Sequence, residues 1–276
     1  MSHVAAQPGA QGAYVASPYG IRSGKLAMWL FILSDAVTFA AMLFACGYLR
    51  LASPDWVRPF AFHPVIVGGI IMTVVLLASA LTMASAVAAS ASGNRAAALR
   101  WIVVTVLLGL AFTVANLHEW RNMLAEGWRP GVNPTGGSTL VGATFFAITG
   151  LSILHVVAGI VAIGVIAMKY RAGRIGAGAV ETVGLYWQFV NVAWMFVFPL
   201  VYVMNLRSGL PASALPLLLV LASLGAASAL LYLMRLRHER PILLWSVVLT
   251  LLFTLLMMNH IWADALRLAR LRLPGS

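Results

Sequence analysis

Long apolar runs, separated by short polar or proline- and glycine-rich breaks, dominate this chain of 276 residues. Seven of the runs reach the length of about 20 residues that an α-helix needs to cross a bilayer. We expect membrane helices at residues 26–49, 64–90, 96–118, 139–168, 182–206, 213–235 and 241–263. The pattern therefore predicts an all-α integral membrane protein, a polytopic helical bundle of about seven transmembrane helices.

The amino-acid composition agrees with this fold class and limits the kinds of partner that the chain can bind. Hydrophobic residues make up 62% of the chain and charged residues 9%, whereas about a quarter of the residues of a soluble domain are charged. The net charge of +11 comes from basic residues spread in small groups between the apolar runs, without the basic face that binds nucleic acid. We expect no nucleic-acid partner and interpret the basic residues as topology signals.

The basic residues predict an orientation. A cytoplasmic N-terminus places ten of them inside and five outside, and the three arginines of the C-terminal tail oppose it. The tendency of basic residues to stay on the cytoplasmic side favours this orientation. We divide the chain into a flexible N-terminal tail (1–21), a five-helix membrane domain (22–206), and a C-terminal helical hairpin with a basic tail (207–276).

One carboxylate lies deep inside the first run. Asp35 is the only charged residue between positions 26 and 49, and helix geometry places it about 14 Å from the start of that run. An ionised acid is costly at this depth, and so short a side chain does not reach the interface. We expect Asp35 to have a partner, a proton or a function.

The fourth run carries regularly spaced polar residues. Thr149, Ser152 and His155 recur every three residues, and Gly159 follows four residues later. Such a face packs closely against another helix or faces a polar ligand. The simpler interpretation is a helix contact in which a neighbouring carbonyl binds the imidazole. The sequence supplies no further histidines at membrane depth to complete a metal site, so we expect no metal, haem or copper in this chain.

The fifth run contains a second polar set. Gln188 and Asn191 stand three residues apart on one face, and Trp187 and Trp194 lie seven residues apart on a neighbouring stripe. The amides can hydrogen-bond another helix, while tryptophans near span ends commonly mark the membrane interface. Trp194 lies in the middle of the run, which fits an interfacial position less well.

Charged residues follow the third run. Glu119, Trp120 and Arg121 begin a stretch of balanced charge, which we interpret as an interfacial turn with a solvated face. Contact with a partner subunit is the alternative. The chain contains no nucleotide-binding loop, nucleophile–base pair or metal-ligand spacing. We therefore expect no catalytic residue in this chain.

Several of these motifs follow the order of a known family. They are residues 29–39 with Ser34-Asp35, Glu119-Trp120, Thr149-Gly150 with His155, and residues 186–194 with Trp187 and Trp194. Together they fall within residues 22–206, and they resemble subunit III of the haem–copper terminal oxidases, which comprise cytochrome c and quinol oxidases. Bacterial members often have five helices, and this chain resembles that form.

The resemblance implies a non-catalytic subunit of a respiratory oxidase in the bacterial cytoplasmic membrane. The implied partners are subunit I, which carries the haem and copper, and subunit II, and the implied ligand of this chain is phospholipid. Family members hold lipid in a cleft between helices and support proton uptake into subunit I. Asp35 falls where the family carries an intramembrane glutamate. The positions assigned to the lipid cleft or to polar helix contacts are Ser34, Thr149, Ser152, His155, Trp187, Gln188, Asn191 and Trp194.

Differences from the family pattern leave alternatives open. Gln188, Asn191 and Ser152 stand where the family carries ionisable residues, so hydrogen bonds can survive there but a charge pair or proton relay cannot. This favours a divergent member, belonging to a variant oxidase or a nitric-oxide-reductase-like complex. An assembly factor derived from subunit III is a further alternative. An ion-coupled secondary transporter with its ion at Asp35 is another, although the sequence shows no clear inverted repeat.

Overall fold

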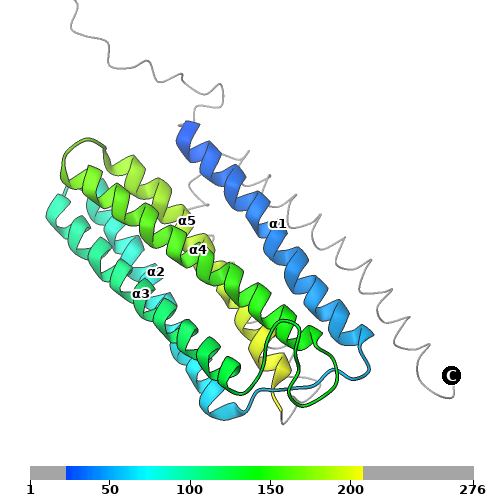
Figure 1. The fold of residues 1–276 in the computed structure, drawn as a ribbon. Coiled ribbons are helices and arrows are strands. Elements are labelled where there is room, and N and C mark those ends of the chain that lie inside the picture. Colours follow the sequence, from blue (N-terminus) through cyan, green and yellow to red (C-terminus); the bar gives the residue numbers. More distant parts are fainter. Residues whose placement is uncertain (1–22, 208–276) are drawn as a thin grey trace, which may run out of the picture.

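The computed structural model describes residues 23–207, and this part of the chain is built from helices without a β-strand (Figure 1). Its long helices are α1 (Ser23–Ala52), α2 (Val67–Ala91), α3 (Arg95–Ala125), α4 (Leu140–Arg171) and α5 (Ala177–Val197). With their flanking turns, all five are long and apolar enough to cross a membrane. The predicted fold class is confirmed for these residues. The apolar runs at 213–235 and 241–263, and most of the two predicted tails, lie outside them.

Two π-helical turns adjoin the long helices. Residues Phe62–Ile66 precede α2, and Phe198–Tyr202 follow α5 before a 3₁₀ turn at Val203–Asn205. Pro199 has no amide hydrogen to donate to the carbonyl four residues earlier, so regular α-helical bonding stops at this point and the turn widens.

The third helix runs farther than the apolar pattern predicted. We expected it to end at residue 118, and α3 continues to Ala125 over 31 residues. At about 1.5 Å per residue, such a helix is longer than the roughly 30 Å hydrocarbon core. The first charged residues after the run therefore mark the end of the apolar layer and not the end of the helix.

Short loops join the helices at one end of the bundle and long loops at the other. The connectors cover residues 53–61, 92–94, 126–139 and 172–176. The two long loops contact each other, because the Ser138 N–H donates to the Asp55 carbonyl (3.2 Å). Gly137 permits this contact: its φ is +86°, and a Cβ there would lie 2.7 Å from the Asp55 oxygen.

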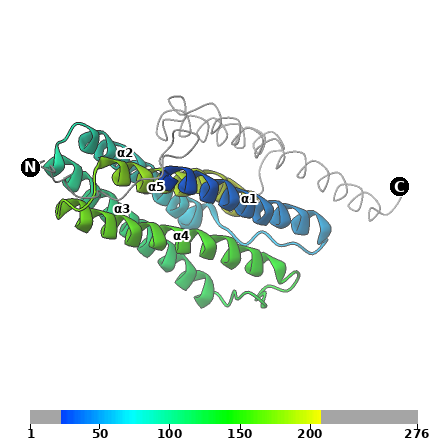
Figure 2. The ribbon, with the colours of Figure 1, turned by 90° about the horizontal axis from the view of Figure 1, so that it is seen from above.

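Helix α5 is the most buried of the five long helices. The helices α2, α3, α4 and α5 pack in a ring, and α1 packs chiefly against α4 and α5 (Figures 1 and 2). In the most apolar stretch of α5, 56% of the residues are buried, against 22% to 33% in the other four helices. Much of the apolar surface of α1 to α4 faces outward, as expected for helices surrounded by lipid.

The Trp187 side chain on α5 joins three neighbouring helices. It is fully buried, and its indole N–H donates to Ser79 Oγ on α2 (3.1 Å). A Cβ added at Gly109 of α3 would lie 2.7 Å from the indole ring, and one added at Gly159 of α4 would lie 2.9 Å from it. The two glycines therefore leave the space that the indole occupies.

Substitution of Gly159 tests this packing. Gly159→Ala should lower the free energy of unfolding by about 1–3 kcal/mol, because the new methyl group overlaps a ring that is held on both sides. Gly164→Ala on the same helix is the matched control, since nothing lies within 4 Å of its added Cβ. We expect that control to be neutral or to stabilise by up to about 1 kcal/mol. Thermal unfolding of the purified variants measures both, and equal midpoints would contradict the placement of Trp187 between α3 and α4.

Candidate functional site

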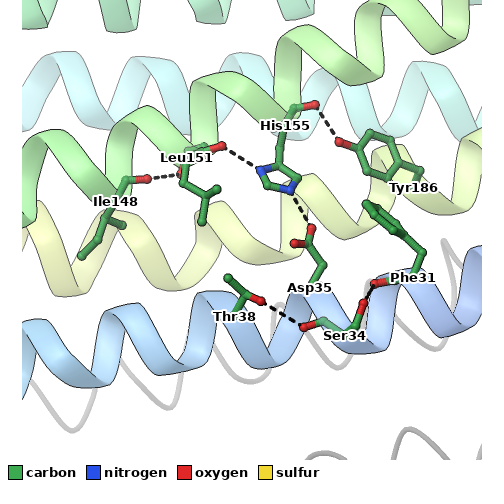
Figure 3. A network of polar contacts seen from close by, with 9 residues as sticks. Phe31, Ser34, Asp35, Thr38, Ile148, Leu151, His155 and Tyr186 are labelled. Atoms are coloured by element: carbon green, nitrogen blue, oxygen red, sulfur yellow. Dashed lines mark hydrogen bonds and ion pairs between the residues drawn. The ribbon is translucent and has the colours of Figure 1, made fainter.

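Asp35 of α1 and His155 of α4 form a pair inside the bundle. Asp35 Oδ2 lies 2.7 Å from His155 Nε2, and the two side chains are 13% and 11% exposed (Figure 3). Both residues lie near the middle of their helices, which places the pair far from either membrane surface. The structure thus gives Asp35 a partner that the sequence alone did not identify.

A backbone carbonyl determines which ring nitrogen of His155 carries a hydrogen. Nδ1 lies 2.7 Å from the carbonyl oxygen of Leu151, one turn earlier in α4. A carbonyl oxygen only accepts, so Nδ1 donates and Nε2 is left to share a proton with Asp35. The pair then exists as a carboxylic acid with a neutral imidazole, or as a carboxylate with an imidazolium. Both forms are neutral overall, which limits the cost of holding them at membrane depth.

Aromatic side chains surround the pair. The Phe39 ring meets the His155 imidazole edge-on, with centroids 5.1 Å apart, and the Tyr186 hydroxyl donates to the His155 carbonyl (3.0 Å). The Phe31 ring lies 5.9 Å from the Tyr186 ring. Apart from His155, Asp35 Oδ2 has no hydrogen-bond partner among residues 23–207. The pair is therefore the polar centre of an apolar contact between α1, α4 and α5.

Ser34 precedes Asp35 but does not join the pair. Its hydroxyl donates to the Phe31 carbonyl (2.8 Å), and the Thr38 hydroxyl donates to the Ser34 carbonyl (3.2 Å). Figure 3 shows both bonds running along α1. Ser34 and Thr38 are exposed, and bonding to its own helix is how a hydroxyl is commonly satisfied on a membrane helix.

The polar residues of α4 contact different neighbours. The Trp120 indole N–H of α3 donates to Thr149 Oγ1 (2.9 Å), the Ser152 hydroxyl donates to the Ile148 carbonyl (3.0 Å), and His155 faces α1. Three residues turn an α-helix by about 300°, so each step in this spacing shifts the side-chain direction by about 60°. The structure therefore does not bring Thr149, Ser152 and His155 together in one site.

The polar residues of α5 mainly face α2. Gln188 Nε2 donates to the Ala80 carbonyl (2.8 Å), and the Trp194 indole N–H donates to Thr73 Oγ1 (2.9 Å). Asn191 Nδ2 donates within α5, to the Trp187 carbonyl (2.8 Å). Trp194 is 2% exposed, so it lies in the core of the bundle and not at its surface. These side chains form an interface separate from the Asp35–His155 pair.

Sequence reasoning missed the two hydroxyl acceptors on α2. Thr73 and Ser79 stand within the apolar run 64–90, and each receives an indole N–H from α5. Their polarity inside that run was the available signal. The pairing with α5 becomes visible only when the two helices lie side by side.

The interpretation of Glu119 as part of a solvated turn was wrong. Glu119 belongs to α3 and is 7% exposed, and Asn116, three residues earlier, is fully buried. Buried Phe112 and Met123 recur on the same helical face, which turns Glu119 toward the core. Neither amide atom of Asn116 has a hydrogen-bond partner in the part of the chain that the structure describes. Arg121 is exposed, in agreement with its predicted surface position.

A cavity of about 400 Å³ opens between the end of α2 and the start of α5, at the end of the bundle with the short loops. Val87, Ser90, Gly178 and Glu181 are among the residues that line it. Lys25 Nζ of α1 lies 2.9 Å from Glu181 Oε1. The residues assigned to the lipid cleft from sequence do not line this cavity.

Metal-ligand clusters are absent from the described region. Among residues 23–207, no group of three or more histidine, cysteine or acidic side chains could hold a metal ion. The Asp35–His155 pair joins a carboxyl group to an imidazole near the middle of two helices, and such a pair can hold or move a proton.

Known sequences match most of this chain. The family model described as cytochrome c oxidase subunit III matches residues 5–206. Cytochrome c oxidase subunit 3 of Alkalihalophilus pseudofirmus is 32% identical over 185 residues, which cover 65% of this chain and 86% of the relative. Cytochrome bo(3) ubiquinol oxidase subunit 3 of Pseudomonas putida is 29% identical over 188 residues, 65% of this chain and 85% of the relative. A probable quinol oxidase subunit 3 of Staphylococcus aureus is 32% identical over 189 residues, 66% of this chain and 89% of the relative.

Proposed function

We propose that this chain, which belongs to the cytochrome c oxidase subunit III family, stabilises the haem- and copper-bearing subunit I of a bacterial respiratory oxidase and supports proton uptake into it. Membership makes the chain a membrane-embedded subunit III of a haem–copper oxidase complex. The proposal adds the direct partners, subunits I and II, and a location in the cytoplasmic membrane with the N-terminus inside. The excess of basic residues predicted on the inner side supports that orientation.

The observation that carries the proposal is the Asp35–His155 pair. Its Oδ2–Nε2 distance of 2.7 Å joins a carboxyl group and an imidazole near the middle of two membrane helices. Such a pair can accept one further proton, since a protonated carboxyl beside an imidazolium carries one positive charge. Intramembrane ionisable residues are costly and mark proton or ion pathways more often than packing contacts. We assign to the pair the support of proton uptake.

Bound phospholipid is the second part of the proposal. The cavity of about 400 Å³ between α2 and α5 lies at the membrane-surface end of the bundle. Lys25, within 2.9 Å of Glu181, brings an ammonium group to the Glu181 side of this cavity. Because the Glu181 carboxylate already pairs with that ammonium group, the largely apolar lining suits the glycerol and acyl region of a lipid. We place the lipid there, while haem and copper belong to subunit I.

Purification of the assembled complex through a tag on this chain tests the proposal. We expect a haem-bearing subunit to copurify in equal amount with both the wild type and Asp35→Asn, and the Asp35→Asn complex to lose turnover activity sooner. Ser34→Ala is the matched control, because the Ser34 hydroxyl bonds only within α1 among the described residues. Purification of this chain without a haem-bearing subunit would contradict the structural role. Copurification of only traces of that subunit would also contradict it, because transient association is what an assembly factor would show. An unchanged activity lifetime in Asp35→Asn would contradict the proton role.

A further inference from the structure

Polar groups are buried without partners between α3 and the turn that follows α5. Asn116 and Tyr202 are both fully buried. Neither amide atom of Asn116, nor the hydroxyl of Tyr202, has a hydrogen-bond partner among residues 23–207. Buried polar groups in folded proteins are nearly always paired, either with protein atoms or with ordered water. These three atoms therefore point to a ligand that forms hydrogen bonds.

The packing of α3 brings a carboxyl group to the same place. Phe112, Asn116 and Glu119 follow steps of four and three residues, so they share one face of α3. The Phe112 ring meets the Trp194 ring edge-on, with centroids 4.8 Å apart, and the Trp194 ring lies 5.9 Å from the Tyr202 ring. The Glu119 carboxyl lies close enough to the Tyr202 hydroxyl for the two groups to interact electrostatically. Asn116 thus lies between two positions that both adjoin this aromatic pair.

Aromatic rings enclose the Tyr202 side chain. Its ring stacks on Phe60, with centroids 5.5 Å apart and 22° between the planes, and it meets the Phe145 ring edge-on at 5.6 Å. Phenyl side chains carry neither a donor nor an acceptor of ordinary strength. The polar groups that remain for the Tyr202 hydroxyl are those of Asn116 and Glu119, and no direct hydrogen bond joins it to either within the described region.

Water has the hydrogen-bonding capacity that these groups lack. The amide nitrogen of Asn116 donates, its amide oxygen and the Glu119 carboxyl accept, and the Tyr202 hydroxyl does either. One water molecule both donates and accepts, so it can join groups of both kinds. Buried water typically forms about three hydrogen bonds to polar groups that are otherwise unpaired. The three side chains supply that number.

We infer that Asn116, Glu119 and Tyr202 bind internal water between α3 and the π-helical turn that follows α5. The water pairs the amide and the hydroxyl and joins the Glu119 carboxyl to them. Glu119 is 7% exposed while the other two side chains are fully enclosed, so water enters from the Glu119 side. A carboxyl group in contact with such water exchanges its proton with the solvent. This site is separate from the Asp35–His155 pair and does not depend on the function proposed for it.

X-ray footprinting of the full-length chain in its purified complex tests the site. X-rays form hydroxyl radicals from bound water as well as from bulk water, and these radicals oxidise the side chains that the bound water contacts. We expect Tyr202 to be oxidised several-fold faster than Trp187, which is equally buried and whose N–H bonds Ser79. Mass spectrometry of the digested chain measures both rates. Oxidation of Tyr202 as slow as that of Trp187 would overturn the inference.

Substitution of Asn116 separates a hydrated site from a dry one. Asn116→Leu should slow the oxidation of Tyr202 several-fold and lower the thermal unfolding midpoint, because an apolar side chain of similar size removes hydrogen bonds to the water. Thr113→Val is the matched control, since the Thr113 hydroxyl donates to the Gly109 carbonyl within α3 (2.9 Å), and it should leave the oxidation rate unchanged.

A dry site predicts the opposite shift. Asn116→Leu would then remove two unpaired polar groups from the core and raise the unfolding midpoint. A raised midpoint, or a Tyr202 oxidation rate that Asn116→Leu leaves unchanged, would overturn the inference. If Asn116→Leu does not accumulate, the comparison of Tyr202 with Trp187 in the wild type still decides the matter.

Discussion

Replacing Trp187 by alanine should keep this chain from accumulating in the membrane. The indole is fully buried, bonds Ser79 of α2, and fills the space beside Gly109 of α3 and Gly159 of α4. Removing a buried tryptophan side chain costs about 3–5 kcal/mol, which is a large share of the roughly 5–15 kcal/mol that holds a folded domain together. Immunoblotting of membranes measures the amount of chain, and thermal unfolding measures the stability of any that remains.

Two variants separate packing from hydrogen bonding at this position. Trp101→Ala removes an indole that is 42% exposed on α3, so the amount of chain should match the wild type. Trp187→Phe keeps most of the ring volume and removes the N–H. Its cost should be about 1–2 kcal/mol, because Ser79 keeps the bond that it donates to the Leu76 carbonyl. Trp187→Ala accumulating as well as Trp101→Ala would show that the indole does not hold the helices together.

Replacing either member of the Asp35–His155 pair alone should lower the free energy of unfolding more than replacing both members together. His155→Phe leaves a carboxyl group without its partner near the middle of α1, and Asp35→Leu leaves Nε2 of the imidazole without one. Breaking a buried pair from one side costs about 3–5 kcal/mol, whereas apolar replacement of both members is far less costly. Because the double variant should lose less stability than either single variant, the coupling energy between the two substitutions should be about 3 kcal/mol or more, measured from the thermal stabilities of the two single variants and the double variant.

Thr38 provides the control for this cycle. It lies three residues from Asp35 on the same helix, and its hydroxyl bonds the Ser34 carbonyl. The effects of Thr38→Val and His155→Phe on the free energy of unfolding should therefore be additive within about 0.5 kcal/mol. Additive effects of Asp35→Leu and His155→Phe would mean that the pair contributes nothing as a pair, and the proposed proton role would lose its physical basis.

The boundaries of the helices show how much of the fold the hydrophobic pattern of the sequence predicts. Each of the first five predicted spans corresponds to a helix, because length and apolarity decide whether a segment can cross a bilayer. The predicted end of α3 was seven residues too early. The first charged residues after an apolar run mark the end of the lipid layer, whereas backbone hydrogen bonding decides where the helix ends. The same error led to the solvated interpretation of Glu119, which the continuing helix turns toward the core.

The sequence by itself determined the class of this protein, the five described spans, the family, and the depth of Asp35, because these depend on local apolarity and on motifs in order. Only the tertiary structure decided that Asp35 meets His155, that Thr149 meets Trp120, and that the α5 side chains Trp187, Gln188 and Trp194 bind α2. Each of these contacts depends on how two helices are rotated against each other. That rotation results from the packing of all the helices together, which the polar pattern of one helix does not specify.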